Sequence, residues 1–119
     1  MKNLFAVFIL TTVITLVSCN GKTSASLEST SANGKVKVKI DAHRNNVFDA
    51  FKTEMSVKAY DFKEGKLIFE IMADDLNNEN VQFKWTDDNN CIISIEERDK
   101  HTRSFQLIAS DNQVQLAEI

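Results

Sequence analysis

The chain has 119 residues and a mass of 13.5 kDa, a size that accommodates one domain. Its hydrophobic fraction of 43% and charged fraction of 26% are typical of a globular protein, and a formal net charge of -3 offers no cationic surface for nucleic acid. The glycines, Gly21, Gly34 and Gly65, are too far apart for a dinucleotide-binding fingerprint or a phosphate-binding loop.

A positively charged start and an uncharged apolar segment open the chain. Lys2 precedes the stretch from Leu4 to Val17, in which three threonines are the only polar residues. These 14 residues would span about 21 Å as a helix, which is short of the roughly 30 Å hydrocarbon core of a bilayer. We therefore interpret residues 1–18 as a cleaved signal peptide and not as a transmembrane anchor.

The end of this segment, Leu16-Val17-Ser18-Cys19, resembles the lipobox of bacterial lipoproteins. The resemblance implies cleavage before Cys19, a diacylglycerol on its sulfur and, as a rule, acylation of the new amino terminus. Several acyl chains hold a protein firmly on a bilayer, whereas a single chain binds only marginally. The alternative is an ordinary secretory signal with an unrelated cysteine at the cleavage site. Beyond residue 19 the chain resembles no family.

Asn20 follows the cysteine at the position where an aspartate retains many lipoproteins in the inner membrane. The resemblance therefore implies an outer-membrane location. The next residues contain no acidic cluster of the kind that accompanies export to the cell surface in some bacteria. A lipid-anchored position in the cell envelope, facing the periplasm, is predicted.

Residues 19–34 are predicted to comprise the lipidated Cys19 and a flexible tether. Serine and threonine dominate residues 20–33, and Leu27 is the only large apolar residue among them. Such a coil would hold the domain roughly 20 Å from the lipid headgroups. The single globular domain is expected over residues 35–119.

Alternation of apolar and polar residues dominates this domain and predicts antiparallel strands. The expected strands cover residues 35–40, 53–62, 66–73, 81–86, 91–97, 102–109 and 113–118, with turns at Glu64-Gly65, Asp88-Asn89, Asp99-Lys100 and Asp111-Asn112. Residues 46–53 are the helical candidate, with Asn46 as its cap, and a strand there is the close alternative. The predicted fold class is all-β, a small antiparallel meander or β-sandwich of about seven strands with at most one short helix.

Three lysines, Lys35, Lys37 and Lys39, share one face of the first predicted strand and are the candidate binding residues. Close to a membrane they would contact lipid phosphates or anionic wall polymers. The favoured alternative is protection of an edge strand, because lysine on an outer strand blocks edge-to-edge pairing.

Oxygen-rich side chains crowd residues 74–80 and 87–90. The EF-hand pattern, with its central glycine and terminal glutamate, is missing from both segments. Solvated loops are the favoured interpretation, and neither a metal nor a cofactor is expected.

No catalytic constellation is evident. Glu96 and Glu97 are neighbours in a predicted strand and therefore point to opposite faces. His43 and His101 fall in predicted turns without metal-ligand spacing, and Cys91 leads an apolar run that predicts a buried, inert thiol. With Cys19 lipidated, Cys91 has no partner for an intramolecular disulfide. The chain is not expected to be an enzyme.

These observations favour a lipid-anchored envelope protein whose β domain binds another envelope or secreted protein through a sheet face or edge. The membrane is the expected partner of Cys19, and a protein is the expected partner of the domain. The alternative function is a carrier or sensor of a small apolar ligand in a cavity between the sheets. In that case Phe83 and Trp85 would belong to the ligand pocket.

Overall fold

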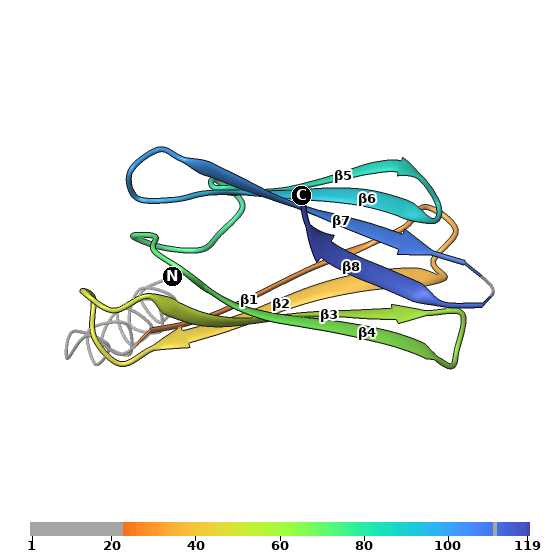
Figure 1. Ribbon diagram of the computed structural model, residues 1–119, viewed down its shortest axis with the longest axis horizontal. Helices are drawn as coiled ribbons and strands as arrows, with labels where there is room; N and C mark the ends of the chain where they lie inside the picture. Colours follow the sequence, from red (N-terminus) through yellow and green to blue (C-terminus); the bar gives the residue numbers. More distant parts are fainter. Residues whose placement is uncertain (1–22, 111) are drawn as a thin grey trace, which may run out of the picture.

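The computed structural model describes residues 23–110 and 112–119, which form a β-sandwich (Figure 1). The described residues contain no helix. Their strands are β1 (Thr23–Thr30), β2 (Val36–Arg44), β3 (Phe51–Ala59), β4 (Lys63–Ile71), β5 (Val81–Asp87), β6 (Asn90–Glu96), β7 (Thr102–Ala109) and β8 (Val114–Glu118). The all-β prediction is confirmed, with eight strands in place of about seven.

The strands form two antiparallel meanders of four strands each. Sheet A has the order β1-β2-β3-β4 and sheet B has the order β5-β6-β7-β8, so strands adjacent in the chain are adjacent in space. Residues 72–80 connect the two sheets. Each sheet has one apolar face, and packing the two faces together removes both from water.

The core lies between the sheets and follows directly from the alternation along the strands. Val36, Val38 and Ile40 of β2 are fully buried, and the lysines between them face solvent. Phe69 of β4 and Phe105 of β7 contact each other across the interior, with ring centroids 4.6 Å apart. Such burial contributes about 1.5–3 kcal/mol for each large apolar side chain.

Residues 23–30 belong to the sandwich, so the prediction of a flexible tether over residues 19–34 is wrong for this segment. β1 pairs with β2 along its whole length, from Thr23 opposite Arg44 to Thr30 opposite Lys37. Leu27 packs against the core. The hydrogen bonds of β2 stabilise a segment whose own serine- and threonine-rich composition favours coil. Cys19, the predicted signal peptide and residues 20–22 lie outside the described residues.

The helical candidate at residues 46–53 is also wrong. Residues 45–50 form a loop, in which the backbone N–H of Phe48 donates to Asn46 Oδ1 at 2.9 Å. Phe51 already belongs to β3, where it is buried and lies opposite Ile71 of β4. Pairing with two neighbouring strands therefore outweighs the short helical pattern.

The turn between β3 and β4 lies at residues 60–62 and not at Glu64-Gly65. Tyr60 and Asp61 adopt positive φ angles of 59° and 126° in this turn. Gly65 lies inside β4 instead, opposite Val57 of β3. A side chain at this position would be too close to β8, because a Cβ atom there would be 2.8 Å from Cγ1 of Val114. This glycine permits close packing of the sheets and does not make a turn.

The predicted turns at Asp88-Asn89 and Asp99-Lys100 are confirmed, and Lys100 has a φ of 72°. Asp111 of the last predicted turn lies outside the described residues. The remaining strands match their predicted ranges closely; β7 matches residues 102–109 at both ends.

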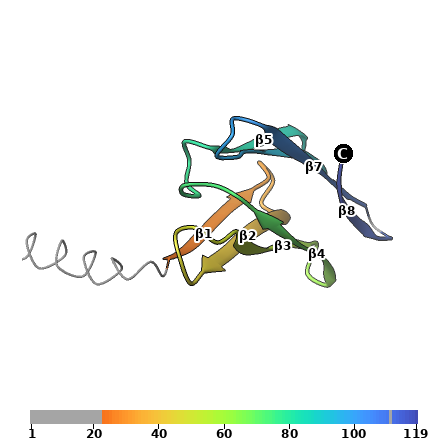
Figure 2. The same cartoon turned by 60° about the vertical axis from the view of Figure 1, so that its left-hand side comes forward.

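Loops gather at two ends of the sandwich (Figures 1 and 2). We call one the arginine end, which comprises residues 45–50, 72–80 and 97–101 together with the start of β1. We call the other the tyrosine end, which comprises residues 31–35, 60–62 and 88–89. They lie at the left and the right of Figure 1, respectively.

Candidate functional site

The outer face of sheet A carries the charged side chains that the sequence analysis selected. Strand pairing arranges this face in four cross-strand rows, with Ser24, His43, Lys52 and Glu70 in the first, Ser26, Asp41, Glu54 and Ile68 in the second, Glu28, Lys39, Ser56 and Lys66 in the third, and Thr30, Lys37, Lys58 and Glu64 in the fourth. The second row contains two acidic residues and no lysine, whereas the third and fourth rows each contain two lysines and one glutamate.

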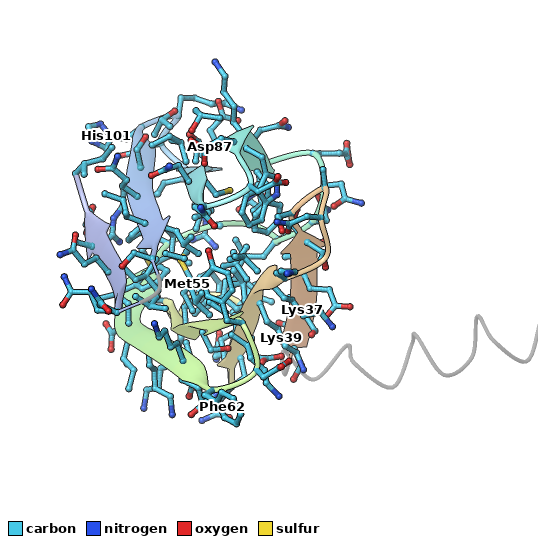
Figure 3. All side chains as sticks on the ribbon, turned by 90° about the vertical axis from the view of Figure 1, so that its right-hand side faces the viewer. Lys37, Lys39, Met55, Phe62, Asp87 and His101 are labelled. Atoms are coloured by element: carbon cyan, nitrogen blue, oxygen red, sulfur yellow. The ribbon has the colours of Figure 1, made fainter. Side chains whose placement is uncertain are left out.

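The predicted binding lysines line two adjoining hollows on this face, and Figure 3 labels Lys37 and Lys39 there. Lys35 and Lys37 line one hollow together with Lys58 and Asp61. Lys37 and Lys58 also line the neighbouring groove, together with Lys39 and Lys66 on either side of Ser56. The structure therefore adds Lys58 and Lys66, which sequence reasoning missed.

Ion pairs already engage Lys37 and Lys39, two of the three predicted binding lysines. Lys37 Nζ lies 3.6 Å from a carboxylate oxygen of Glu28, and Lys39 Nζ lies 3.9 Å from Asp41. All four side chains are about half exposed, so each pair contributes only about 0–1 kcal/mol and a ligand can displace it at little cost.

The edge-protection interpretation of these lysines is wrong, because β2 lies between β1 and β3 inside sheet A. Their expected closeness to the chain start is wrong as well. Lys37 pairs with Thr30, at the far end of β1 from Thr23. An eight-residue strand spans about 23 Å, so Lys35 and Lys37 lie at the tyrosine end, a full strand away from Thr23.

The oxygen-rich segment at residues 74–80 uses its side chains to bond the chain itself. Asp74 pairs with Arg98 at 2.7 Å, and Asn80 Oδ1 accepts the backbone N–H of Asn77 at 3.0 Å. Asp87 accepts the N–H of Asn89 and the side-chain amide of Asn90, and these bonds lower the pKa of its carboxyl. In residues 23–110 and 112–119, no group of three or more His, Cys, Asp or Glu side chains is arranged to hold a metal ion.

The two histidines do not meet. His43 lies in β2 and faces solvent on the outer face of sheet A, so its predicted place in a turn is wrong. His101 is exposed at the arginine end, after the turn between β6 and β7. Glu97 directly follows β6, and its carboxylate accepts the backbone N–H of Met72 at 3.3 Å. These groups do not converge on a common point.

Cys91 is fully buried, as predicted. Burial raises the pKa of its thiol to about 11, which the backbone bond with Lys84 only partly opposes. A thiolate nucleophile needs a lowered pKa and solvent access. Cys91 is therefore a core side chain.

Buried side chains from both sheets pack together in one core. Phe83 and Trp85 are partly buried and pack against the core, and Trp85 Nε1 donates to Ser29 Oγ of β1 at 2.9 Å. Grooves of about 510 and 480 Å³ lie instead on the outer face of sheet A. These positions favour binding at the surface over binding inside.

The outer edge of β1 is the least protected strand edge in the described part of the chain. β1 has β2 as its only neighbour, and its eight residues pair without a bulge. It contains neither lysine nor proline, and its only charged residue is Glu28, which already pairs with Lys37. Small hydroxyl side chains at Ser24 and Ser26 leave its backbone accessible.

The other three edges carry the features that block edge-to-edge pairing. β8 has only five residues, and β5 has a register shift between Trp85 and Asp87. β4 carries Lys63 and Lys66, and its Gly65 packs on Val114 of β8. The β1 edge and the adjacent outer face of sheet A together form the candidate binding surface.

Comparisons with known proteins do not indicate what binds to this surface, because no protein-family model, curated protein or solved structure matches the chain. None of the described residues forms a helix of the length and apolarity that crossing a membrane requires.

Proposed function

We propose that this protein is a lipid-anchored module of the bacterial cell envelope that binds another envelope or secreted protein by accepting a strand of that partner at the β1 edge. The accessible, unbulged edge of β1 is the observation that carries the proposal. In strand addition the main chain supplies affinity and alternate side chains supply specificity.

The outer face of sheet A supports selectivity at this edge. A strand added to β1 would place every second side chain beside Ser24, Ser26 and Glu28, within one further strand of Lys37 and Lys39. Because these lysines are held by exposed ion pairs only, acidic side chains of a partner can compete for them. We therefore expect a partner segment that is extended and carries acidic residues.

A photo-crosslinking residue at Glu28 tests the proposal in cells that express the full chain. The same residue at Gln115, which is exposed on the β8 edge, is the matched control. We expect one discrete protein adduct from position 28 and none from position 115. Equal adducts from both positions, or none from position 28, would refute strand addition at β1.

Two neighbouring proline variants separate edge binding from stability. Alternate residues of an antiparallel strand bond the partner strand, and the residues between them face away. One of Ala25→Pro and Ser26→Pro therefore removes a bond to β2, and the other removes an N–H that faces the open edge. We expect the variant that retains its unfolding midpoint to lose the adduct formed at position 28.

A further inference from the structure

Large apolar side chains are exposed at the arginine end. Val47 is 45% exposed and Phe48 is 79% exposed, both in the loop between β2 and β3, and Met72 beyond the end of β4 is 38% exposed. We call Val47 and Phe48 the apolar tip. Exposed apolar side chains at the end of a loop, away from any strand edge, are typical of a surface that contacts another phase or molecule.

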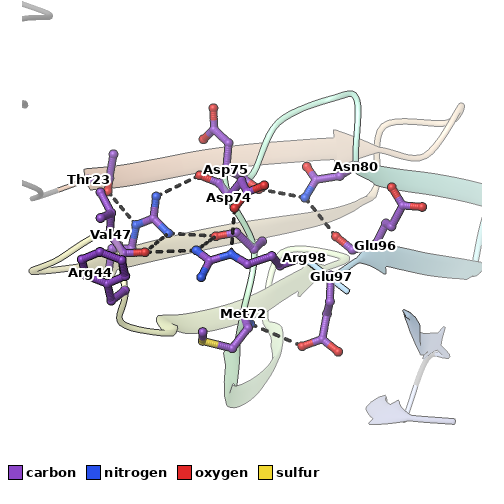
Figure 4. Close-up of polar contacts among 12 residues, drawn as sticks. Thr23, Arg44, Val47, Met72, Asp74, Asp75, Asn80, Glu96, Glu97 and Arg98 are labelled. Atoms are coloured by element: carbon purple, nitrogen blue, oxygen red, sulfur yellow. Dashed lines mark hydrogen bonds and ion pairs between the residues drawn. The ribbon is translucent and has the colours of Figure 1, made fainter. Parts of the chain in front are cut away.

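Two arginines fix the base of this tip (Figure 4). Arg44 Nη1 donates to the backbone oxygen of Val47 at 3.4 Å, and Arg98 Nη2 donates to the same oxygen at 3.0 Å. Arg98 also donates its backbone N–H to Met72 at 2.8 Å. Because the loop is anchored from below, Phe48 is displayed in a defined position.

Arg44 also joins the apolar tip to the start of β1. Arg44 Nε donates to Thr23 Oγ1 at 2.9 Å, and Thr23 lies opposite Arg44 in the sheet. Only residues 20–22 separate Thr23 from Cys19. Four residue steps reach at most about 14 Å, so acyl chains on Cys19 place the bilayer surface at this end of the sandwich.

We propose that Val47 and Phe48 insert into the bilayer that holds the lipidated Cys19. The inference rests on the lipid anchoring in the proposed function. Insertion docks the arginine end on the membrane and directs the tyrosine end away from it. A lipid anchor by itself leaves the domain free to tumble. Insertion of the apolar tip gives the domain a defined orientation on the membrane.

Polar groups around the tip suit the headgroup layer. His43, Lys52, Asp49 and Glu70 line a hollow of about 260 Å³ beside the loop, so both signs of charge are present there. Apolar and aromatic side chains that enter the boundary between headgroups and acyl chains, with charged groups behind them, are the usual arrangement of interfacial anchors.

Phe62 provides a matched control. It is 90% exposed in the loop between β3 and β4, at the tyrosine end. Phe48 and Phe62 are therefore alike in residue type and in exposure, and they differ in their distance from Thr23.

The experiment uses the mature protein produced in a bacterium from the full chain and reconstituted into vesicles of phosphatidylethanolamine and phosphatidylglycerol. Phe48→Cys and Phe62→Cys variants each receive an environment-sensitive fluorophore, and the buried Cys91 stays unlabelled. Lipids brominated on the acyl chain quench from inside the bilayer, and iodide quenches from water. Intact mass reports the acyl chains on Cys19 independently.

We expect brominated lipid to quench the fluorophore at position 48 and iodide to quench the fluorophore at position 62. With acyl chains present, a label at position 48 that responds to iodide refutes insertion and leaves the anchor standing. Protection of position 48 from both quenchers means that protein covers it, and quenching of both positions by brominated lipid means that the domain lies flat; each result overturns the proposal. A mass without acyl chains refutes the anchor and the insertion together.

Discussion

The two ends of the sandwich each expose one phenylalanine on a loop next to β3, but they hold the sheets together differently. At the arginine end, the buried side chain of Arg44 donates to the backbone oxygens of Ala73 and Asp74 at 2.8 Å each. Its guanidinium also lies 4.2 Å from the ring centroid of Phe51. One side chain thus ties β2 to the segment that connects the sheets.

The tyrosine end relies on separate hydrogen bonds. Tyr60 Oη donates to Asn89 Oδ1 at 2.6 Å, and the backbone N–H of Asn33 donates to Asp88 at 3.1 Å. Each bond joins one pair of groups, and water can replace the exposed ones. Loss of one side chain should therefore disturb the arginine end far more than the tyrosine end.

The largest expected effect is that of Arg44→Met. The substitution removes the Arg44 donors from the carbonyls of Ala73 and Asp74, and of these two carbonyls only Ala73 keeps another side-chain donor, Arg98 Nη2 at 3.3 Å. It should lower the free energy of unfolding by about 3 kcal/mol. Urea unfolding followed by Trp85 fluorescence measures it. Arg98→Met is the control, because its side chain is 35% exposed and its partner Asp74 is 84% exposed. An equal loss for both variants would contradict the central role of Arg44.

A smaller loss is expected from Gly65→Ala near the tyrosine end. The added Cβ would lie 2.8 Å from Cγ1 of Val114, whose branched side chain rotates little. Overpacking of this kind costs about 1–3 kcal/mol. In a double-mutant cycle with Val114→Ala, most of the cost of Gly65→Ala should disappear. Additive losses would show that the contact between β4 and β8 is not the cause.

Tyr60→Phe should cost about 1 kcal/mol, because it removes one hydrogen bond to Asn89 and keeps the ring. The same urea titration measures the change. Asn89→Ala removes the other partner, and the two losses should not add. A loss from Tyr60→Phe as large as that from Arg44→Met would abolish the contrast between the ends.

The smallest effect concerns the ion pair between Arg103 and Glu118. Arg103 Nε and Nη2 donate to Glu118 at 2.9 and 2.8 Å, and these bonds lower the pKa of the Glu118 carboxyl. A lowered folded-state pKa contributes stability above the unfolded value of about 4.3, and this contribution is lost as the pH falls through the folded-state pKa.

Glu118→Gln should therefore be slightly less stable than the native protein at pH 7, and the difference should vanish in acid. Thermal unfolding of both proteins across this range measures it. A difference that persists at a pH below the folded-state pKa would show that Glu118 acts through packing and not through its charge.

Local pattern was enough to predict most strands. Uninterrupted alternation placed Val36, Val38 and Ile40 on a buried face, and the buried positions of β6 and β7 follow from the same rule. The burial of Cys91 was predictable from the apolar run that it leads. The acyl anchor on Cys19 remains a prediction.

Tertiary pairing decided the features that local pattern could not show. β1 forms because β2 supplies its hydrogen bonds. A glycine is needed at position 65 of β4 because Val114 leaves no room there for a side chain. The open β1 edge follows from the strand order, which no residue of β1 encodes by itself. Alternation records which face of a strand is buried, whereas edges, bridging arginines and the end to which a loop belongs depend on residues far apart in the chain.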